Sequence, residues 1–255
     1  MASTALATWS HMLAPPPTLD LTTSALFADL DGTLAPIEPT PGDVGPDRQR
    51  ARLLGRLSRA LSGRLAVISG RGLADLDRVL GAGVSAVAAA HGLVRRTADG
   101  RLVGAQATLP EAARAAFLAL GCANPALLME DKGPAIALHY RAAPDAGPAC
   151  EAAARRLADR YGLGLQHGRM VVELRAPGRT KADAVTAFMA EPPFAGARPV
   201  FLGDDLTDED GFAAAQGLGG YGVIVGRRRP TAARFALPNV EAALAWLERA
   251  LEAGR

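Results

Sequence analysis

ALFADLDGTL, residues 25–34, is an apolar run that ends in two aspartates and a glycine. Residues two apart on a strand point the same way, roughly 6.5 to 7 Å from each other. Asp29 and Asp31 would therefore place two carboxylates at the end of a buried strand. Because bare carboxylates repel each other and resist desolvation, Mg²⁺ and a phosphate group are their natural partners, and aspartate can also attack phosphorus covalently. The alternative is an Asp-Gly turn that only ends the strand.

A second apolar run, residues 65–68, ends in a hydroxyl and a glycine, Ser69 and Gly70. A helical pattern follows over residues 73–80. Backbone N–H groups at the start of that helix would point at a bound anion, and the Ser69 hydroxyl could donate one more hydrogen bond. The pattern is typical of a phosphate-binding loop, although a plain serine helix cap also explains Ser69.

A capping pattern opens a helix at Thr180, because Asp183 follows it by three residues. Lys181 then lies in the first turn, where a cation opposes the helix dipole. That position indicates a nearby anion, which Lys181 would neutralise. The alternative is an exposed lysine in water.

A further apolar run, residues 199–202, ends in Gly203 and an acidic cluster. The later acids, from Asp208, could favour the N-terminus of the next helix. Asp204 and Asp205 come too early for that role, because they stand at the strand end itself. Ligands of an open α/β sheet collect at the carboxyl ends of its strands. The four segments therefore predict one site with a carboxylate pair, a hydroxyl, a lysine and an acidic cluster.

The four motifs, in this order, resemble those of the haloacid dehalogenase superfamily of phosphatases. Within it the chain is similar to the trehalose-6-phosphate phosphatase family. The similar stretches are DGTLAPI at residues 31–37, Ser69-Gly70-Arg71, His91-Gly92 and GDDLTDE at residues 203–209. The resemblance implies an α/β fold, with a Rossmann-like core around a parallel sheet and an inserted α/β cap domain that closes over the active site.

The pattern of elements agrees with an insertion. Strand and helix alternate from Ala25 to about Leu80, and again from Lys181 onward. The segment between them contains a hairpin with an Asp99-Gly100 turn and then reads twice as helix, strand, strand. We expect a flexible N-terminal tail over residues 1–22, a core over residues 23–104 and 177–255, and a cap over residues 105–176.

The cap would select the sugar, because the core motifs reach only the phosphate, the metal and the scissile oxygen. Acids and cations on the cap strands make good hydroxyl binders through charge-assisted hydrogen bonds. The resemblance implies that the disaccharide is contacted by Glu130, Lys132, Arg141, Arg169 and Glu173. We interpret the nearby His139 as part of an exposed strand face. In the core motifs, Gly32, Thr33, Gly70 and Arg71 are expected to contact the substrate.

The resemblance implies Mg²⁺-dependent hydrolysis of trehalose 6-phosphate in trehalose biosynthesis. Asp29 would form an aspartyl-phosphate, and Asp31 would protonate the leaving sugar oxygen and then activate water. Ser69 and Lys181 would hold the transferred group. The metal is expected to bind Asp29, the backbone carbonyl of Asp31 and Asp204, with Asp205 and Asp208 orienting these ligands or holding Lys181.

Three alternatives use the same motifs. A phosphomutase would keep water from its aspartyl-phosphate, and a phosphatase for sucrose phosphate or mannosyl-glycerate phosphate would share the cap architecture. A non-catalytic sugar-phosphate sensor is disfavoured, because both carboxylates of the first motif are intact.

Composition agrees with a soluble enzyme. The chain has 255 residues, of which 49% are hydrophobic and 21% charged, enough for a full core. A net charge of +2 argues against general nucleic-acid binding, and we interpret the basic run at residues 227–229 as a solvated loop. The two cysteines fit a reducing cytoplasm, and no apolar stretch is long enough to span a membrane. We expect a cytoplasmic monomer.

Overall fold

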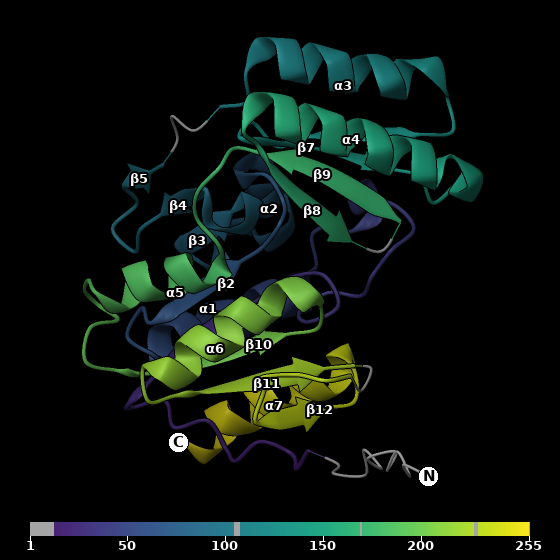
Figure 1. The fold of residues 1–255 in the computed structure, drawn as a ribbon. Helices are drawn as coiled ribbons and strands as arrows, with labels where there is room; N and C mark the ends of the chain where they lie inside the picture. Colours follow the sequence, from purple (N-terminus) through teal and green to yellow (C-terminus); the bar gives the residue numbers. More distant parts are fainter. Residues whose placement is uncertain (1–12, 105–107, 169, 227–228, 255) are drawn as a thin grey trace, which may run out of the picture.

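The computed structural model describes residues 13–104, 108–168, 170–226 and 229–254, whose strands form two sheets (Figure 1). The larger sheet contains β1 (Ser24–Ala28), β2 (Leu65–Ile68), β3 (Ala86–Ala89), β4 (Val94–Arg96), β5 (Leu102–Val103), β10 (Arg198–Gly203), β11 (Tyr221–Val225) and β12 (Phe235–Leu237). Its order is β12, β11, β10, β1, β2, β3, β4, β5. Pairing is parallel from β12 to β3 and antiparallel for β4 and β5. The predicted parallel α/β architecture is confirmed.

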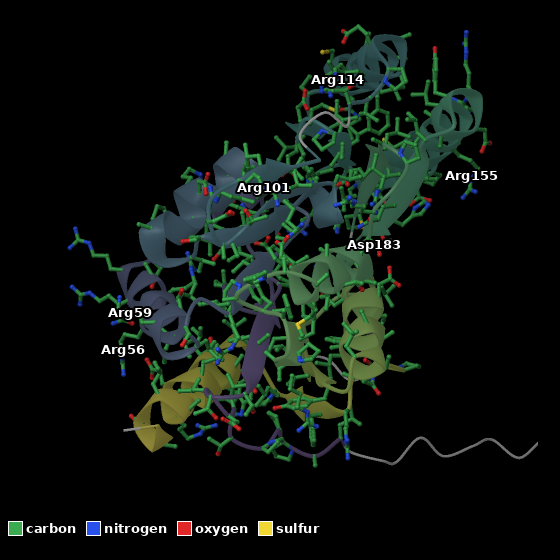
Figure 2. All side chains as sticks on the ribbon, turned by 90° about the vertical axis from the view of Figure 1, so that its left-hand side faces the viewer. Arg56, Arg59, Arg101, Arg114, Arg155 and Asp183 are labelled. Atoms are coloured by element: carbon green, nitrogen blue, oxygen red, sulfur yellow. The ribbon has the colours of Figure 1, made fainter. Side chains whose placement is uncertain are left out.

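Helices cover both faces of this sheet, which we call the eight-stranded core. One face packs against α1 (Arg48–Ala60), α2 (Leu73–Leu80) and α7 (Val240–Ala253), and the other against α5 (Lys181–Met189) and α6 (Glu209–Gly217). Side chains of β1 alternate between the two hydrophobic clusters, with Leu26 in the first and Phe27 in the second. Strands buried on both faces are apolar throughout. The side chains of Arg56 and Arg59 on α1 point outward from the molecule (Figure 2).

The smaller sheet and its two helices form what we call the four-stranded unit, residues 108–176. It contains β6 (Leu128–Asp131), β7 (Ala135–His139), β8 (Gly164–Gly168) and β9 (Val171–Arg175), in the antiparallel order β6, β7, β9, β8. The helices α3 (Glu111–Ala123) and α4 (Gly147–Tyr161) lie on the face away from the eight-stranded core (Figure 1). Phe117, Ile136 and Val172 are buried between the helices and the sheet. The opposite face of this sheet lines the candidate functional site.

The unit enters the chain between two halves of the eight-stranded core. The hairpin of β4 and β5 precedes it, with Gly100 in the left-handed region at φ +90°, which agrees with the predicted Asp99-Gly100 turn. Afterwards α5 and β10 return the chain to the core, where β10 pairs with β1, in register from Ala28 beside Leu202. The centre of the core is therefore built from segments on both sides of the insertion.

The described part of the predicted N-terminal tail, residues 13–22, packs against the core. Leu19 is buried, and the indole N–H of Trp246 donates to the Pro17 carbonyl at 2.9 Å. The N–H of Ala236 donates to the Ala14 carbonyl at 3.1 Å. Proline removes donors but leaves carbonyls free, so this segment can accept hydrogen bonds from α7 and the edge strand β12. Residues 1–12 lie outside the described ranges. None of the helices within those ranges combines the length and apolarity that crossing a bilayer needs.

Candidate active site

The carboxyl ends of β1 and β10 meet in an acidic cluster. Because the two strands are parallel neighbours, Asp29 and Asp204 follow them at the same edge of the sheet, and the Asp29 N–H donates to the Leu202 carbonyl at 2.9 Å. Carboxylate oxygens of Asp29, Asp204 and Asp208 lie within 4.8 Å of one another. The structure thus brings together the acids of two motifs that are distant in sequence.

Lys181 is held inside this cluster by the start of α5. The predicted capping pair is present, because the Thr180 hydroxyl accepts the Asp183 N–H and the Asp183 carboxylate accepts the Thr180 N–H. The Lys181 Nζ lies 3.0 Å from Asp29 Oδ1 and 2.6 Å from Asp208 Oδ1. Lys181 is 2% exposed and Asp208 fully buried, so these contacts are shielded from water. The alternative of an exposed lysine is wrong.

Asp208 also fixes the loop after β10. Its Oδ2 accepts the N–H groups of Asp204 and Asp205, each at 3.0 Å. Asp205 is exposed and its carboxylate accepts the Leu206 N–H at 2.7 Å. Asp208 therefore uses both oxygens to hold Lys181 and the backbone, whereas Asp29 and Asp204 keep oxygens free for a ligand.

Burial and the repulsion between neighbouring carboxylates disfavour the ionised forms of Asp29 and Asp204. Burial, opposed by Lys181 and reinforced by Asp208, Asp204 and Asp31, raises the pKa of Asp29 well above its ordinary value. Burial and the charge of Asp208 raise the pKa of Asp204 to about 7. For Lys181 burial alone would lower the pKa, but Asp208 and Asp29 more than offset it and the pKa is raised. Carboxylates in this condition are stabilised by a further positive charge.

The cluster fits a hard divalent cation. Its donors are all oxygens, which suits Mg²⁺ or Ca²⁺ rather than a metal that prefers thiolate or imidazole. Gly32 lies in the left-handed region at φ +81°, and a Cβ there would lie 2.1 Å from Asp204 Oδ2. Only glycine therefore lets the first motif approach Asp204. The Thr33 hydroxyl, fully buried, donates to Asp204 Oδ1 at 3.4 Å.

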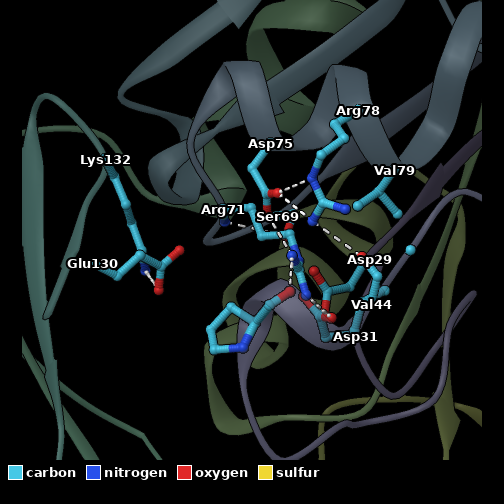
Figure 3. A network of polar contacts seen from close by, with 12 residues as sticks. Asp29, Asp31, Val44, Ser69, Arg71, Asp75, Arg78, Val79, Glu130 and Lys132 are labelled. Atoms are coloured by element: carbon cyan, nitrogen blue, oxygen red, sulfur yellow. Dashed lines mark hydrogen bonds and ion pairs between the residues drawn. The ribbon is translucent and has the colours of Figure 1, made fainter. Parts of the chain in front are cut away.

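The Asp31 side chain is paired with Arg71 (Figure 3). Arg71 donates to both Asp31 oxygens at 2.7 Å and to the Pro41 carbonyl at 2.8 Å, and it also pairs with Asp75. Burial would lower the pKa of Arg71, but its hydrogen bonds to Asp31 and Asp75 and the charges of these two carboxylates raise it overall. Arg71 therefore orients Asp31 with a bidentate contact and has no nitrogen left without a partner.

Ser69 lies between this network and the acidic cluster, at the end of β2. It is buried, and its Oγ accepts the Arg71 N–H at 3.3 Å. The residue at the N-cap of α2 is Gly72, so the alternative of a serine helix cap is wrong. Gly70 is packed closely, since a Cβ there would lie 2.5 Å from His91 Nε2.

The open face of the four-stranded unit carries a second charged cluster. Glu130, Ala137, Glu173 and Gln166 form one cross-strand row over β6, β7, β9 and β8. Lys132 Nζ lies 2.5 Å from Glu173 Oε2 and 3.7 Å from Glu130 Oε2. His139 Nε2 lies 3.0 Å from Glu130 Oε2, so the interpretation of His139 as part of an exposed face is wrong.

A pocket of about 760 Å³ joins the two clusters. It is lined on one side by Asp29, Asp31, Ser69, Lys181 and Asp204, and on the other by Glu130, Lys132, His139, Gln166 and Glu173. Figure 3 shows Glu130 and Lys132 facing the Arg71 network. The volume lies within the range typical of small-molecule sites. One pocket can therefore present both clusters to one ligand.

Two predicted sugar contacts differ in what the structure places around them. Arg141 lines the pocket but donates to the backbone carbonyls of Glu38 and Pro39, each at 2.8 Å, so in this structure it joins the four-stranded unit to a core loop. Arg169 lies outside the described residues. Contact of either with substrate stays a prediction.

Two site residues were missed by sequence reasoning. Gln166 could have been found from the alternation of β8, because it shares a face with Glu173 once the register is known. Arg229 was assigned to a solvated loop, which is wrong: it pairs with Glu209 and donates to the carbonyls of Asp205 at 2.6 Å and Asp204 at 3.5 Å. No local pattern signals that contact. Residues 227–228 lie outside the described ranges.

Comparisons with known sequences identify a family. The sequence model of the family described as Trehalose-phosphatase matches residues 27–240. A "Trehalose-6-phosphate phosphatase" of Escherichia coli is 41% identical over 229 residues, which cover 88% of this chain and 85% of that protein. A "Probable trehalose-phosphate phosphatase" of Sinorhizobium fredii is 40% identical over 227 residues, 88% of this chain and 86% of the relative.

The fold has solved counterparts. The C-terminal domain of the C. albicans trehalose-6-phosphate phosphatase superimposes with a TM-score of 0.77 at 26% identity, covering 91% of this chain and 94% of that domain. The similarity therefore extends over both sheets.

Proposed function

The chain belongs to the trehalose-phosphatase family, and we propose that it is a phosphoric monoester hydrolase that converts trehalose 6-phosphate to trehalose and inorganic phosphate. The observation that carries the proposal is one pocket with a buried Asp29–Lys181 pair at one side and a row of charged and polar side chains at the other. The first can receive a phosphoryl group and the second can hold hydroxyl groups.

The proposed reaction has two steps. Asp29 attacks phosphorus in line, and the bond from phosphorus to the sugar oxygen breaks while Asp31 gives its proton to that oxygen. Asp31 then takes a proton from water, which attacks the aspartyl-phosphate, frees Asp29 and gives inorganic phosphate. Lys181 and the Ser69 hydroxyl hold the oxygens of the transferred group.

Arg71 sets a condition on this role of Asp31. Both Asp31 oxygens accept hydrogen bonds from Arg71 in the structure. To act as acid, Asp31 must carry a proton on one of these oxygens, which replaces a contact with Arg71, and direct it to the ester oxygen of the substrate. Substrate binding would thus bring Asp31 into use, and Arg71 would hold the carboxylate in position between turnovers.

We propose Mg²⁺ as the metal, held by Asp29, the backbone carbonyl of Asp31 and Asp204, with Asp205 and Asp208 orienting these groups. A bound Mg²⁺ neutralises charge on the transferring phosphoryl oxygens. Chelator should abolish phosphate release, Mg²⁺ should restore it, and Mg²⁺ should also raise the melting temperature of the substrate-free protein, because it offsets the repulsion at Asp29 and Asp204. Full activity in excess chelator would contradict the proposal.

We propose further that the four-stranded unit is a cap, inserted at residues 105–176 into a core of residues 23–104 and 177–255. Support comes from Glu173, whose buried Oε1 accepts no hydrogen bond from the described residues. A buried acceptor of this kind calls for a donor, which a sugar hydroxyl would supply. Glu130 and Lys132 would bind neighbouring hydroxyls.

A phosphate-release screen over trehalose 6-phosphate, sucrose phosphate, a mannosyl-glycerate phosphate and glucose 6-phosphate tests the substrate. We expect the highest catalytic efficiency with trehalose 6-phosphate. Release of phosphate also separates a hydrolase from a phosphomutase, which would yield an isomeric sugar phosphate instead. A preference for another disaccharide phosphate would retain the chemistry and overturn the substrate.

We also propose a cytoplasmic monomer, on sequence grounds alone, to be tested by light scattering and cell fractionation.

A further inference from the structure

A backbone feature next to the phosphate loop has no role in the reaction described above. Ala90, His91 and Gly92 follow β3 with three successive positive φ angles, 46°, 56° and 101°. Such angles are uncommon for residues with a side chain and persist only where the surroundings fix them. The N–H of Ala90 donates to the Arg71 carbonyl at 2.8 Å, and that of His91 to the Ser69 carbonyl at 2.9 Å. The stretch is thus bound to the loop that carries Ser69.

This backbone aims the His91 ring at the four-stranded unit. The ring is buried over Gly70, and its Nε2 lies 2.9 Å from the amide nitrogen of Gln166 on β8 and 3.8 Å from Glu173 Oε1 on β9. Gln166 and Glu173 are direct cross-strand partners. His91 of the core therefore contacts the four-stranded unit at the row that holds the proposed sugar-binding side chains.

The polarity of the contact is set by Arg175. Its guanidinium donates to Gln166 Oε1 at 3.0 Å, so the amide NH₂ group faces His91 and the imidazole nitrogen accepts. Only an unprotonated nitrogen can accept. Burial, with the charges of Lys181, Lys132 and Arg175, lowers the pKa of His91 well below its ordinary value, which keeps the ring neutral.

We propose that His91 and Gln166 are positioning residues, which fix the four-stranded unit over the Ser69 loop so that Glu173 and Lys132 grip the sugar while its phosphate reaches Asp29. The proposal rests on the proposed function and adds two residues to it. Its physical basis is that a small error in alignment between two binding groups costs rate even when each group is intact. Neither residue needs to touch the reacting atoms.

The main test is Gln166→Leu, which keeps volume but removes the donor. We expect catalytic efficiency on trehalose 6-phosphate to fall about tenfold or more, mainly through kcat, because the phosphate is bound but misaligned. Hydrolysis of p-nitrophenyl phosphate, too small to bridge the two sheets, should change less than twofold. The matched control is His167→Leu, the next residue on β8, whose half-exposed side chain is directed to Glu151; it should change neither substrate.

A double-mutant cycle adds His91→Asn, because asparagine tolerates the left-handed backbone. If the two residues act through their contact, the double variant should be little worse than the worse single variant. Hydrogen exchange on the substrate-free proteins supplies a readout without substrate: Gln166→Leu should speed exchange at residues 90–92 and in β8, and His167→Leu should not.

Several outcomes overturn the inference. Unchanged activity of Gln166→Leu on the sugar phosphate, additive effects in the cycle, or a parallel loss of both substrates with a lowered melting temperature would each reduce the contact to a structural one. Failure of the wild type on trehalose 6-phosphate with success on another sugar phosphate would overturn the substrate instead, and the cycle is then measured with that substrate. The hydrogen-exchange experiment tests whether the His91–Gln166 contact fixes the four-stranded unit, even if no sugar phosphate is hydrolysed.

Discussion

Two charged clusters face each other across the pocket, and they differ in how their charges are matched. In the eight-stranded core, Asp29 and Asp208 pair with Lys181 and Asp204 lies beside these two carboxylates, and the pKa values of Asp29 and Asp204 are raised. In the four-stranded unit, burial would raise the pKa of Glu130, yet the hydrogen bond from His139 and the charge of Lys132 lower it overall.

The difference separates chemistry from recognition. The core cluster stores repulsion that a bound cation would relieve, and that cation would in turn attract the oxygens of a phosphoryl group, so its binding energy is available to the reaction. In the cluster of the four-stranded unit the ionised groups stabilise one another, because the pKa of Lys132, which burial would lower, is raised by Glu173 and Glu130. Carboxylates that already have a cation as partner suit a neutral ligand group such as a sugar hydroxyl. Changes in the core should therefore affect every substrate, and changes in the unit only those that reach it.

The strongest test of this contrast is Asp29→Asn. An amide is a poor nucleophile, so turnover should fall by roughly a thousandfold or more, for sugar and aryl phosphates alike. Phosphate release under saturating substrate measures it, with the melting temperature as control for folding. Turnover within tenfold of wild type would remove Asp29 as nucleophile.

Asp31→Asn should be next in size and should depend on the leaving group. Loss of a general acid costs about a hundredfold to ten-thousandfold, and the loss should be larger for a sugar phosphate, whose alkoxide needs a proton, than for an aryl phosphate, whose phenolate leaves unaided. Single-turnover rates on the two substrates provide the comparison. Equal losses would show that Asp31 is not the acid.

Alanine at Glu130, Lys132 or Glu173 should affect only the sugar. Each charge-assisted contact is worth about 1.5 to 3 kcal/mol, which means about tenfold to more than a hundredfold in kcat/KM on trehalose 6-phosphate. Aryl phosphates should be hydrolysed almost as before. If all three variants lost both substrates in parallel, the division between the two clusters would fail.

Tyr140→Phe should have the smallest effect and tests whether stability of the unit is separable from its selectivity. The Tyr140 hydroxyl donates to Glu151 Oε1 at 2.7 Å, away from the pocket. Burial, and then the hydrogen bond to Glu151, raises the pKa of Tyr140 to about 12, so the phenol stays protonated as a donor. The variant should lose about 0.5 to 1.5 kcal/mol in the free energy of unfolding and keep its kcat/KM. A loss of sugar selectivity with an unchanged free energy of unfolding in urea would contradict this separation.

Much of the architecture could be predicted because it is written in local patterns. Apolar runs that end in Asp29, Ser69 and Asp204 mark strand ends, and the Thr180–Asp183 pair marks the start of α5, as the structure has them. Parallel strands bring such ends to one edge, so the meeting of these segments follows from the fold class.

The contacts that could not be predicted depend on packing between segments distant in sequence. Arg229 looked like part of a solvated run, and only its position beside the loop after β10 makes it a partner of the Asp205 carbonyl. Residues 13–22 looked like a tail because prolines disfavour regular structure, yet the Pro17 carbonyl found a donor on α7. His139 and His91 likewise gained their partners from strands placed by tertiary structure.

The pairing of β1 with β10 has a consequence for the order in which the chain folds during synthesis. As the chain leaves the ribosome, β1 can pair with β2 on one edge, but its other edge stays bare until β10 has been synthesised, after the whole four-stranded unit. The unit is continuous in sequence and can fold during that interval, whereas closing β1 onto β10 is a non-local step of the kind that slows folding and exposes an apolar edge to aggregation. Activity should therefore appear last: in stopped-flow refolding, phosphate release is expected to return with the slowest phase, after protection of the amides in β7 and β9.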